Sequence, residues 1–297
     1  AAWRAGSSLL VVAGRQTATY LLRGGYTLIM LAVVAMVAAG VIVNDYGDGS
    51  SASRIQRLQA LAPAVATAVL WVQLIALPLA AAALTAPLIS EERRSGTLQT
   101  LLTTPMKAWQ IVLGKVLGPI VQILILTLLG VPMLLAVRVF GGITIEYILA
   151  GTALAMSTCI LAAVCGLFAS IAARRGIAGS GLGIAILLII DGGIALLVAY
   201  LNYELGLGIR EWFFAALFPP IALAALSESI FNAPGLMGGS AQIWVGAVAW
   251  NIAWSVLLFI ATAWRLRTAM LKDAAGGSAV VEQDDEAAAQ PAPPARP

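Results

Sequence analysis

Asp191 is the residue whose type and position most directly raise the question of chemistry. It lies in the apolar stretch LLIIDGGIALL, and a carboxylate at the centre of a membrane costs about 3 kcal/mol on insertion scales unless it is paired, protonated or hydrated. Such a group can line a transport pathway, carry a proton, or bond to a neighbouring helix. The adjacent Gly192-Gly193 permits close helix approach or a break in the helix. The sequence leaves both the functional and the packing interpretation of Asp191 open.

Neutral polar residues interrupt other apolar stretches. Gln73 and Asn251 each stand among apolar neighbours. Amide side chains in such surroundings favour hydrogen bonds between helices over substrate binding, although a place beside a pathway stays an alternative.

Several classes of chemistry lack their residues. The sequence holds no histidine, the commonest general base and transition-metal ligand. Cys159 and Cys165 lie six positions apart in one apolar stretch and fit no metal or redox spacing, so we expect them to pack. We therefore predict no catalytic residue and no metal site.

The only sequence that approaches a phosphate-binding loop is Gly114-Lys115. That loop needs glycine five positions before the second glycine and a hydroxyl residue after the lysine. Trp109 and Val116 stand at those positions. The chain therefore carries no ATPase motif of this kind, and we expect it to hold no cofactor.

The segment EERRSGTLQTLLTTPMKAWQIVLGK, from Glu91 to Lys115, is dense in charge where charge is otherwise scarce. Ser95-Gly96 marks a helix end, and Thr97 can cap a short helix with leucines at spacings of three and four. Thr104-Pro105 is a second helix start. The segment therefore predicts a short two-faced helix, followed by residues that lead into the next apolar stretch.

The elements that position these residues are membrane helices. The chain is 61% hydrophobic and 10% charged, and a spanning helix needs roughly 20 apolar residues. We predict six spans and an all-α membrane protein. The predicted spans are Gly25–Val43, Ala62–Leu88, Val116–Val137, Ile148–Ala172, Gly181–Leu201 and Ile243–Trp264.

The basic residues predict the orientation of these spans. An even number of spans places both termini on one side, and that side holds 13 of the 17 lysines and arginines. Basic residues concentrate in the cytoplasm. We therefore predict a multi-pass protein of the cell (inner) membrane with both termini, and the segment after span two, in the cytoplasm.

The remaining segments complete the predicted organisation. Residues 1–24 predict a helix lying in the cytoplasmic interface, residues 25–271 the six-span domain, and residues 272–297 a disordered cytoplasmic tail rich in Ala, Pro and Gly. The apolar, Pro-broken part of Asn202 to Gln242 is too short to span, which favours re-entrant helices before span six.

The pattern Glu-Glu-x-x-x-Gly-Thr-Leu-x-x-Leu-Leu-x-Thr-Pro, followed by Gly114-Lys115, resembles the signature of ABC-2 type permeases, the membrane subunits of one class of ABC transporters, mostly exporters. Its position between spans two and three and the six-span layout agree with that family. The resemblance implies that the segment contains a cytoplasmic coupling helix that docks on an ATPase. The implied coupling positions are Glu91, Glu92, Gly96, Thr97, Leu98, Leu101, Leu102 and Pro105.

The same resemblance implies the partners. A separate cytoplasmic ABC ATPase would bind ATP and Mg²⁺. A second permease copy, identical or related, would complete the pathway within membrane lipid. We expect no nucleic-acid partner.

Two other functions stay open as alternatives. An ion-coupled secondary transporter would use Asp191 as proton carrier, although the chain shows no internal repeat. An intramembrane enzyme is favoured less, because Asp191 has no acidic partner in another predicted span.

Overall fold

The structure is a computed structural model of the chain. It describes residues 23–40, 51–90, 108–139, 141–172, 176–206, 208–209, 211–232 and 240–289. Across these ranges the backbone forms helices and short connections and no strand, which confirms the predicted all-α class.

A first helix covers Arg23–Gly40. The labelled elements that follow are α2 (Ser51–Thr85), α5 (Ala108–Arg138), α6 (Ile145–Ala172), α7 (Gly176–Leu188), the π-helix η1 (Ile189–Gly193), α8 (Ile194–Leu205), α9 (Glu211–Leu217), α10 (Pro219–Asn232) and α11 (Ser240–Ala289). A further helical turn after α2 reaches Ser90.

Six helices within the described ranges are long and apolar enough to cross a membrane. They cover Arg23–Gly40, Ala60–Ser90, Trp109–Arg138, Ile145–Ala172, Ala178–Leu205 and Ile243–Thr268. Each contains or closely overlaps one predicted span, so the six-span layout is confirmed. Prolines inside α2 and α5 do not end these helices, which agrees with the tolerance of proline in membrane helices.

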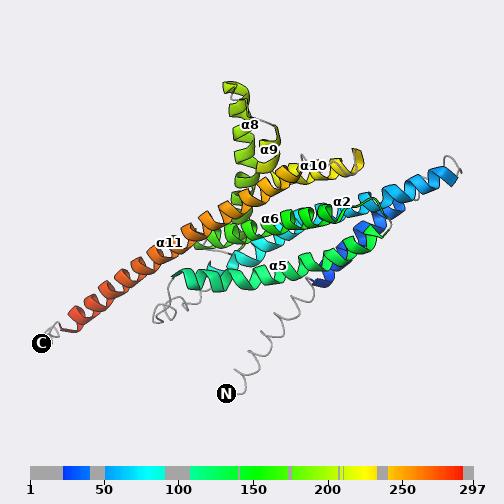
Figure 1. Cartoon of the computed structure of the whole chain (residues 1–297). Coiled ribbons are helices and arrows are strands. Elements are labelled where there is room, and N and C mark those ends of the chain that lie inside the picture. Colours follow the sequence, from blue (N-terminus) through cyan, green and yellow to red (C-terminus); the bar gives the residue numbers. More distant parts are fainter. Residues whose placement is uncertain are drawn as a thin grey trace, which may run out of the picture.

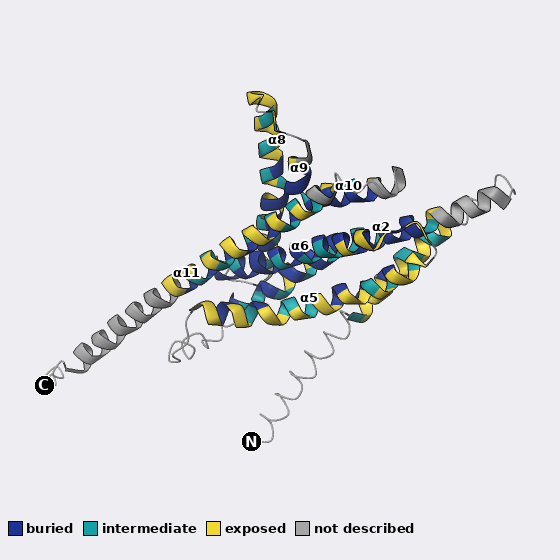
Figure 2. Ribbon diagram, in the orientation of Figure 1, coloured by how far each residue is buried: buried dark blue, intermediate teal, exposed yellow. Residues whose placement is uncertain are grey.

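The central element is α6. Figure 1 shows α2, α5, α6 and α11 running beside one another, whereas α8 and α9 stand at a steep angle to them. In α6, 83% of the spanning window is buried inside the protein, against 11% to 50% in the other five spans. Figure 2 shows this contrast, with α6 largely buried and α5 and α8 exposed along much of their length. The core is therefore built around α6.

Small residues let other helices approach α6 closely. A Cβ atom at Gly166 would overlap Thr85 Oγ1 of α2 and lie 2.7 Å from the carbonyl oxygen of Ala82. A Cβ atom at Gly183 of α7 would lie 2.8 Å from Gly166 Cα. Membrane helices pack closely where small residues meet, so Gly166 is the point at which α2, α6 and α7 come together.

The connection from α5 to α6 is tight because two glycines adopt left-handed backbone angles. Gly141 and Gly142 have φ values of 90° and 81°, which residues with a side chain rarely adopt. Thr144 Oγ1 then accepts a hydrogen bond from the Tyr147 amide at 3.3 Å, as an N-cap residue does. These features turn the chain directly from span three into span four.

Two finer predictions have different outcomes. The residues from Trp109 to Lys115 belong to the same continuous helix as span three, because α5 begins at Ala108; Gly114 does not interrupt it. The helices α9 and α10 occupy the segment for which re-entrant helices are predicted, and their place relative to the membrane stays a prediction.

The structure differs from the sequence prediction beyond residue 272. Disorder is predicted there, whereas α11 continues to Ala289, in keeping with the high helix propensity of Ala and Glu. The interfacial helix predicted for residues 1–24 falls almost wholly outside the described residues. The division of the chain into three parts stays a prediction.

The close packing at Gly166 makes a stability prediction. Gly166→Ala should lower the melting midpoint of the detergent-purified protein by roughly 2–10 °C, because overpacking costs about 1–3 kcal/mol. Gly118→Ala on α5 is the matched control, since a Cβ atom there meets nothing within 4 Å. Thermal unfolding followed by size-exclusion chromatography measures both. Equal midpoints for the two variants would contradict the contact.

Candidate functional site

The segment with the coupling signature lies outside the described residues. Glu91, Glu92, Gly96, Thr97, Leu98, Leu101, Leu102 and Pro105 all fall between residues 91 and 107. The structure does describe both ends of the chain that flank this segment. One end is Ser90, and the other is Ala108 at the start of α5.

Ser170 of α6 holds the end of span two directly before the signature. Its Oγ accepts hydrogen bonds from the amide of Ile89 at 3.1 Å and from the amide of Ser90 at 3.0 Å. Ser90 and Ser170 are both buried. We call Ile89, Ser90 and Ser170 the junction. Because one oxygen bonds two successive amides, the last turn of span two is tied to the buried central helix.

The local sequence breaks the helix of span two just before the junction. Ala86 interrupts the helix as a turn and Pro87 follows it. Proline removes a backbone donor and disturbs the helical bonding around it. Ser170 Oγ therefore bonds the amides of a short helical turn that a turn and a proline separate from α2.

Arg265 lies at the same end of the helices as the junction. Its guanidinium carbon lies 4.8 Å from the ring centroid of Phe168, and Phe168 is two residues from Ser170 on α6. A cation over an aromatic face is attracted by about 0.5–1 kcal/mol. This end of the described helices therefore carries a positive charge beside the junction.

A second polar contact ties span two to α6 farther along both helices. The Tyr147 hydroxyl of α6 forms hydrogen bonds of 3.0 Å with Thr67 Oγ1 of α2 and with Ser227 Oγ of α10. Tyr147 is fully buried. With the junction, span two and α6 are bonded at two positions that are 23 residues apart on each helix, from Thr67 to Ser90 and from Tyr147 to Ser170, or about 35 Å at the rise of an α-helix. They are expected to move as one body.

Asp191 lies where the helix of span five changes its winding. It belongs to the π-helix η1 and is buried, and its Oδ1 has no hydrogen-bond partner among the described residues. A Cβ atom at the adjacent Gly192 would lie 3.6 Å from Phe218 Cε2, between α9 and α10. Short π-helices occur often at functional sites, yet the packing and the functional interpretation of Asp191 both stay open.

Gln73 and Asn251 lie in separate contacts between helices. Gln73 Nε2 of α2 donates to the Thr127 carbonyl of α5 at 3.5 Å. Asn251 Nδ2 of α11 donates to Ser157 Oγ at 3.2 Å and Thr158 Oγ1 at 3.0 Å, both on α6. These donors fit the predicted interhelical role. The acceptor oxygens, Gln73 Oε1 and Asn251 Oδ1, are buried without a partner in the described part of the chain.

The three intramembrane polar residues therefore share no common site. Gln73 bonds to α5, Asn251 bonds to α6, and Asp191 lies in η1 of span five. Among the residues described, no group of three His, Cys, Asp or Glu side chains could hold a metal ion. The arrangement provides polar bonds that link the spans on both sides of the signature segment, and such bonds can transmit movement between helices.

Sequence reasoning missed the residues that form these links. The sequence gives little sign of their roles: Ser170, Tyr147 and Thr67 are single hydroxyls in apolar stretches, and Ser227 is followed by Glu228 and Ser229. Such hydroxyls commonly bond to a carbonyl of their own helix, as Ser255 does with the Asn251 carbonyl at 2.7 Å. Nothing in the sequence separates the two cases, apart from Pro87, which signals that nearby amides need other partners.

The junction makes a prediction about local opening. Ser170→Ala should speed hydrogen–deuterium exchange at the Ile89 and Ser90 amides about tenfold, because a buried group that loses its partner costs about 1–3 kcal/mol. Ser255→Ala removes a buried hydroxyl bonded within its own helix and should leave these amides unchanged. Mass spectrometry of the protein in nanodiscs measures the exchange. Identical exchange in wild type and Ser170→Ala would show that the junction does not hold span two.

Comparison with known proteins agrees with this architecture. Residues 19–269 match the family described as ABC-2 family transporter protein. The matched range contains all six membrane-spanning helices. No curated protein matches the sequence. The chain therefore belongs to the ABC-2 transporter family, and it is a multi-pass membrane permease component of an ABC transporter.

Proposed function

We propose that a separate cytoplasmic ABC ATPase drives this permease through the segment between spans two and three, and that the complex exports its substrate. In this proposal the coupling contacts come from Glu91, Glu92, Gly96, Thr97, Leu98, Leu101, Leu102 and Pro105. ATP and Mg²⁺ bind to the ATPase, and the permease itself holds no cofactor. The family supports a membrane subunit that is not itself an ATPase.

The observation that carries the proposal is the junction. Ser170 fastens the residues directly before the signature to α6, and α5 begins directly after it. A displacement of the segment would therefore act on two rigid elements, the α2–α6 pair on one side and α5 on the other. A hinge of this kind converts movement of a soluble partner into a change of angle between membrane helices.

The proposed orientation places this end in the cytoplasm of the cell (inner) membrane, together with both termini. The positive charge of Arg265 beside the junction supports that orientation.

A second permease copy is proposed to complete the pathway. Leu196, Leu197 and Tyr200 of α8 are each more than half exposed, so lipid or that second copy must cover this apolar surface in the bilayer.

The double variant Leu101→Glu and Leu102→Glu should lose the ATPase. If these leucines form the buried centre of the contact, replacing them should cost at least about 2 kcal/mol, a loss in binding of more than tenfold. The measurement is the amount of ABC ATPase that co-purifies with the tagged permease from its native membranes, identified by mass spectrometry.

Gln99→Glu is the control for added charge in the same segment and should retain the ATPase. Two results would oppose the proposal. One is the absence of any ABC ATPase with the wild-type chain, and the other is equal recovery with wild type and the double variant.

An ion-coupled transporter remains the second candidate, because the Asp191 carboxylate is buried with one oxygen unpartnered among the described residues. The ATP-driven proposal needs no titrating group in span five. Asp191→Asn, which keeps the shape of the side chain but cannot ionise, should leave the ATPase rate of the purified complex unchanged. A complex that still assembles but hydrolyses ATP more slowly would instead give Asp191 a part in the transport cycle.

A further inference from the structure

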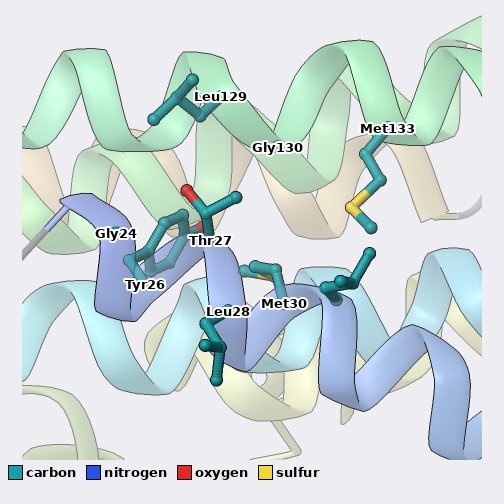
Figure 3. Close-up of a pocket in the computed structure, with 9 residues that line it drawn as sticks. Gly24, Tyr26, Thr27, Leu28, Met30, Leu129, Gly130 and Met133 are labelled. Atoms are coloured by element: carbon teal, nitrogen blue, oxygen red, sulfur yellow. The ribbon is translucent and has the colours of Figure 1, made fainter.

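An apolar cleft of about 460 Å³ lies between the first helix, Arg23–Gly40, and α5. Figure 3 shows Met133 of α5 pointing toward the first helix, which contributes Met30 to the lining of the cleft, whereas Leu28 points away from α5. Its volume falls within the usual range of about 300–1,000 Å³ for small-molecule sites. Leu28 at its edge is 68% exposed, so the cleft opens on the surface that faces the bilayer.

The cleft has a polar group on its wall. Tyr26 lines it and is only 7% exposed, yet its hydroxyl has no hydrogen-bond partner among the described residues. The Gln73 side chain lies close enough to the Tyr26 hydroxyl to interact with it, and Gln73 Oε1 is buried and unpartnered among the described residues. Groups of this kind are rarely left without a partner inside a membrane protein, because no water is present to replace one.

Gly130 of α5 creates the space in which these two groups meet. A Cβ atom there would overlap Gln73 Nε2 and lie 3.8 Å from the Tyr26 hydroxyl. The polar atoms and the apolar cleft therefore adjoin at one point on α5. A ligand that fills the cleft can bring an accepting oxygen atom to the Tyr26 hydroxyl, which is the donor of the pair.

The charge near the cleft indicates the kind of oxygen. Arg23 lies three residues before Tyr26, a spacing that puts both on one helix face. The Arg23 Nε is buried and has no hydrogen-bond partner in the described structure. The Tyr26 hydroxyl and the cationic Arg23 guanidinium are therefore both available donors. They favour a ligand whose polar group accepts hydrogen bonds, such as a carboxylate or an ester carbonyl, over an amine.

We propose that this cleft binds a fatty acyl chain that enters sideways from the bilayer, with its carboxyl or ester oxygens at Tyr26. The apolar walls hold the chain, and the Tyr26 hydroxyl donates to the acyl oxygen. This site does not depend on the coupling segment. It holds whether or not the ATPase binds as proposed above.

The full-length protein in nanodiscs is tested with a palmitic acid that carries a photoreactive diazirine in the carboxyl half of its chain. Labelling should map by mass spectrometry to residues 28–31 and 129–133 and should be competed by unlabelled palmitate. Competition by lysophosphatidylcholine as well would assign the site to acyl chains of phospholipids, and its failure to compete would assign it to free fatty acids. Equal competition by hexadecylamine would overturn the acyl specificity.

Tyr26→Phe separates a binding role from a structural one. It should reduce labelling about fivefold, the worth of one neutral hydrogen bond, without lowering the melting midpoint of the lipid-free protein, because the hydroxyl has no partner to lose. Tyr147→Phe is the matched control, since its hydroxyl has two partners; it should lower the midpoint and leave labelling unchanged. A lower midpoint for Tyr26→Phe with unchanged labelling would overturn the proposal.

A second variant tests the cleft itself. Thr27 is exposed and lines the cleft. Among the contacts described, its hydroxyl bonds only to the Arg23 carbonyl of its own helix. The Thr27→Phe variant should therefore fold, and its ring should fill the cleft. Labelling at residues 129–133 should disappear. Val121→Phe adds the same ring to an exposed position of α5 and should leave labelling intact. Persistent labelling in Thr27→Phe would show that the acyl chain binds elsewhere.

Discussion

The hydrocarbon core of a membrane offers a polar group no solvent partner, and this constraint explains how the described helices are arranged. Each hydroxyl or amide in a span must bond to its own helix or to a neighbour. The bonds that cross between helices converge on α6, which receives α2 at Ser170 and Tyr147 and α11 at Ser157 and Thr158. The most buried span is therefore also the one with most of the interhelical polar contacts described here.

The packing around α6 has the same origin. In lipid the hydrophobic effect does not draw one apolar helix to another, so contact depends on close approach and on polar bonds. Gly166 and Gly183 supply close approach, and the junction, where Ser170 bonds the amides of Ile89 and Ser90, supplies polar bonds. Both features lie toward the end of α6 that adjoins the signature segment. Close packing and polar bonds thus occur together beside the segment that we propose couples to the ATPase.

Unpartnered polar atoms mark where the same constraint is not met within the chain. Asp191 Oδ1 lies in the π-helix of span five, and the Tyr26 hydroxyl and Gln73 Oε1 lie at the cleft beside the first helix. Both places border helices with much exposed apolar surface, the first helix and α8. A permease must let its helices rearrange and must meet molecules from the bilayer, and groups without a fixed partner suit both requirements. Asn251 Oδ1, beside the contact of Asn251 with Ser157 and Thr158 of α6, is a further atom of this kind, so unpartnered groups occur in the core as well.

The sequence alone determined the class, the six spans and the family resemblance. Spans depend on the local average of hydrophobicity, and the signature depends on residue order, so neither needs a contact between distant residues. It also identified Gln73, Asn251 and Asp191 as polar residues in apolar surroundings. Only the tertiary structure decided which of these are bonded, that Ser170 rather than any charged residue holds the end of span two, and that Tyr26 faces a cleft beside Gly130. Those properties depend on which faces of separate helices meet, and a helix buried in lipid carries no polar face in its sequence to reveal this.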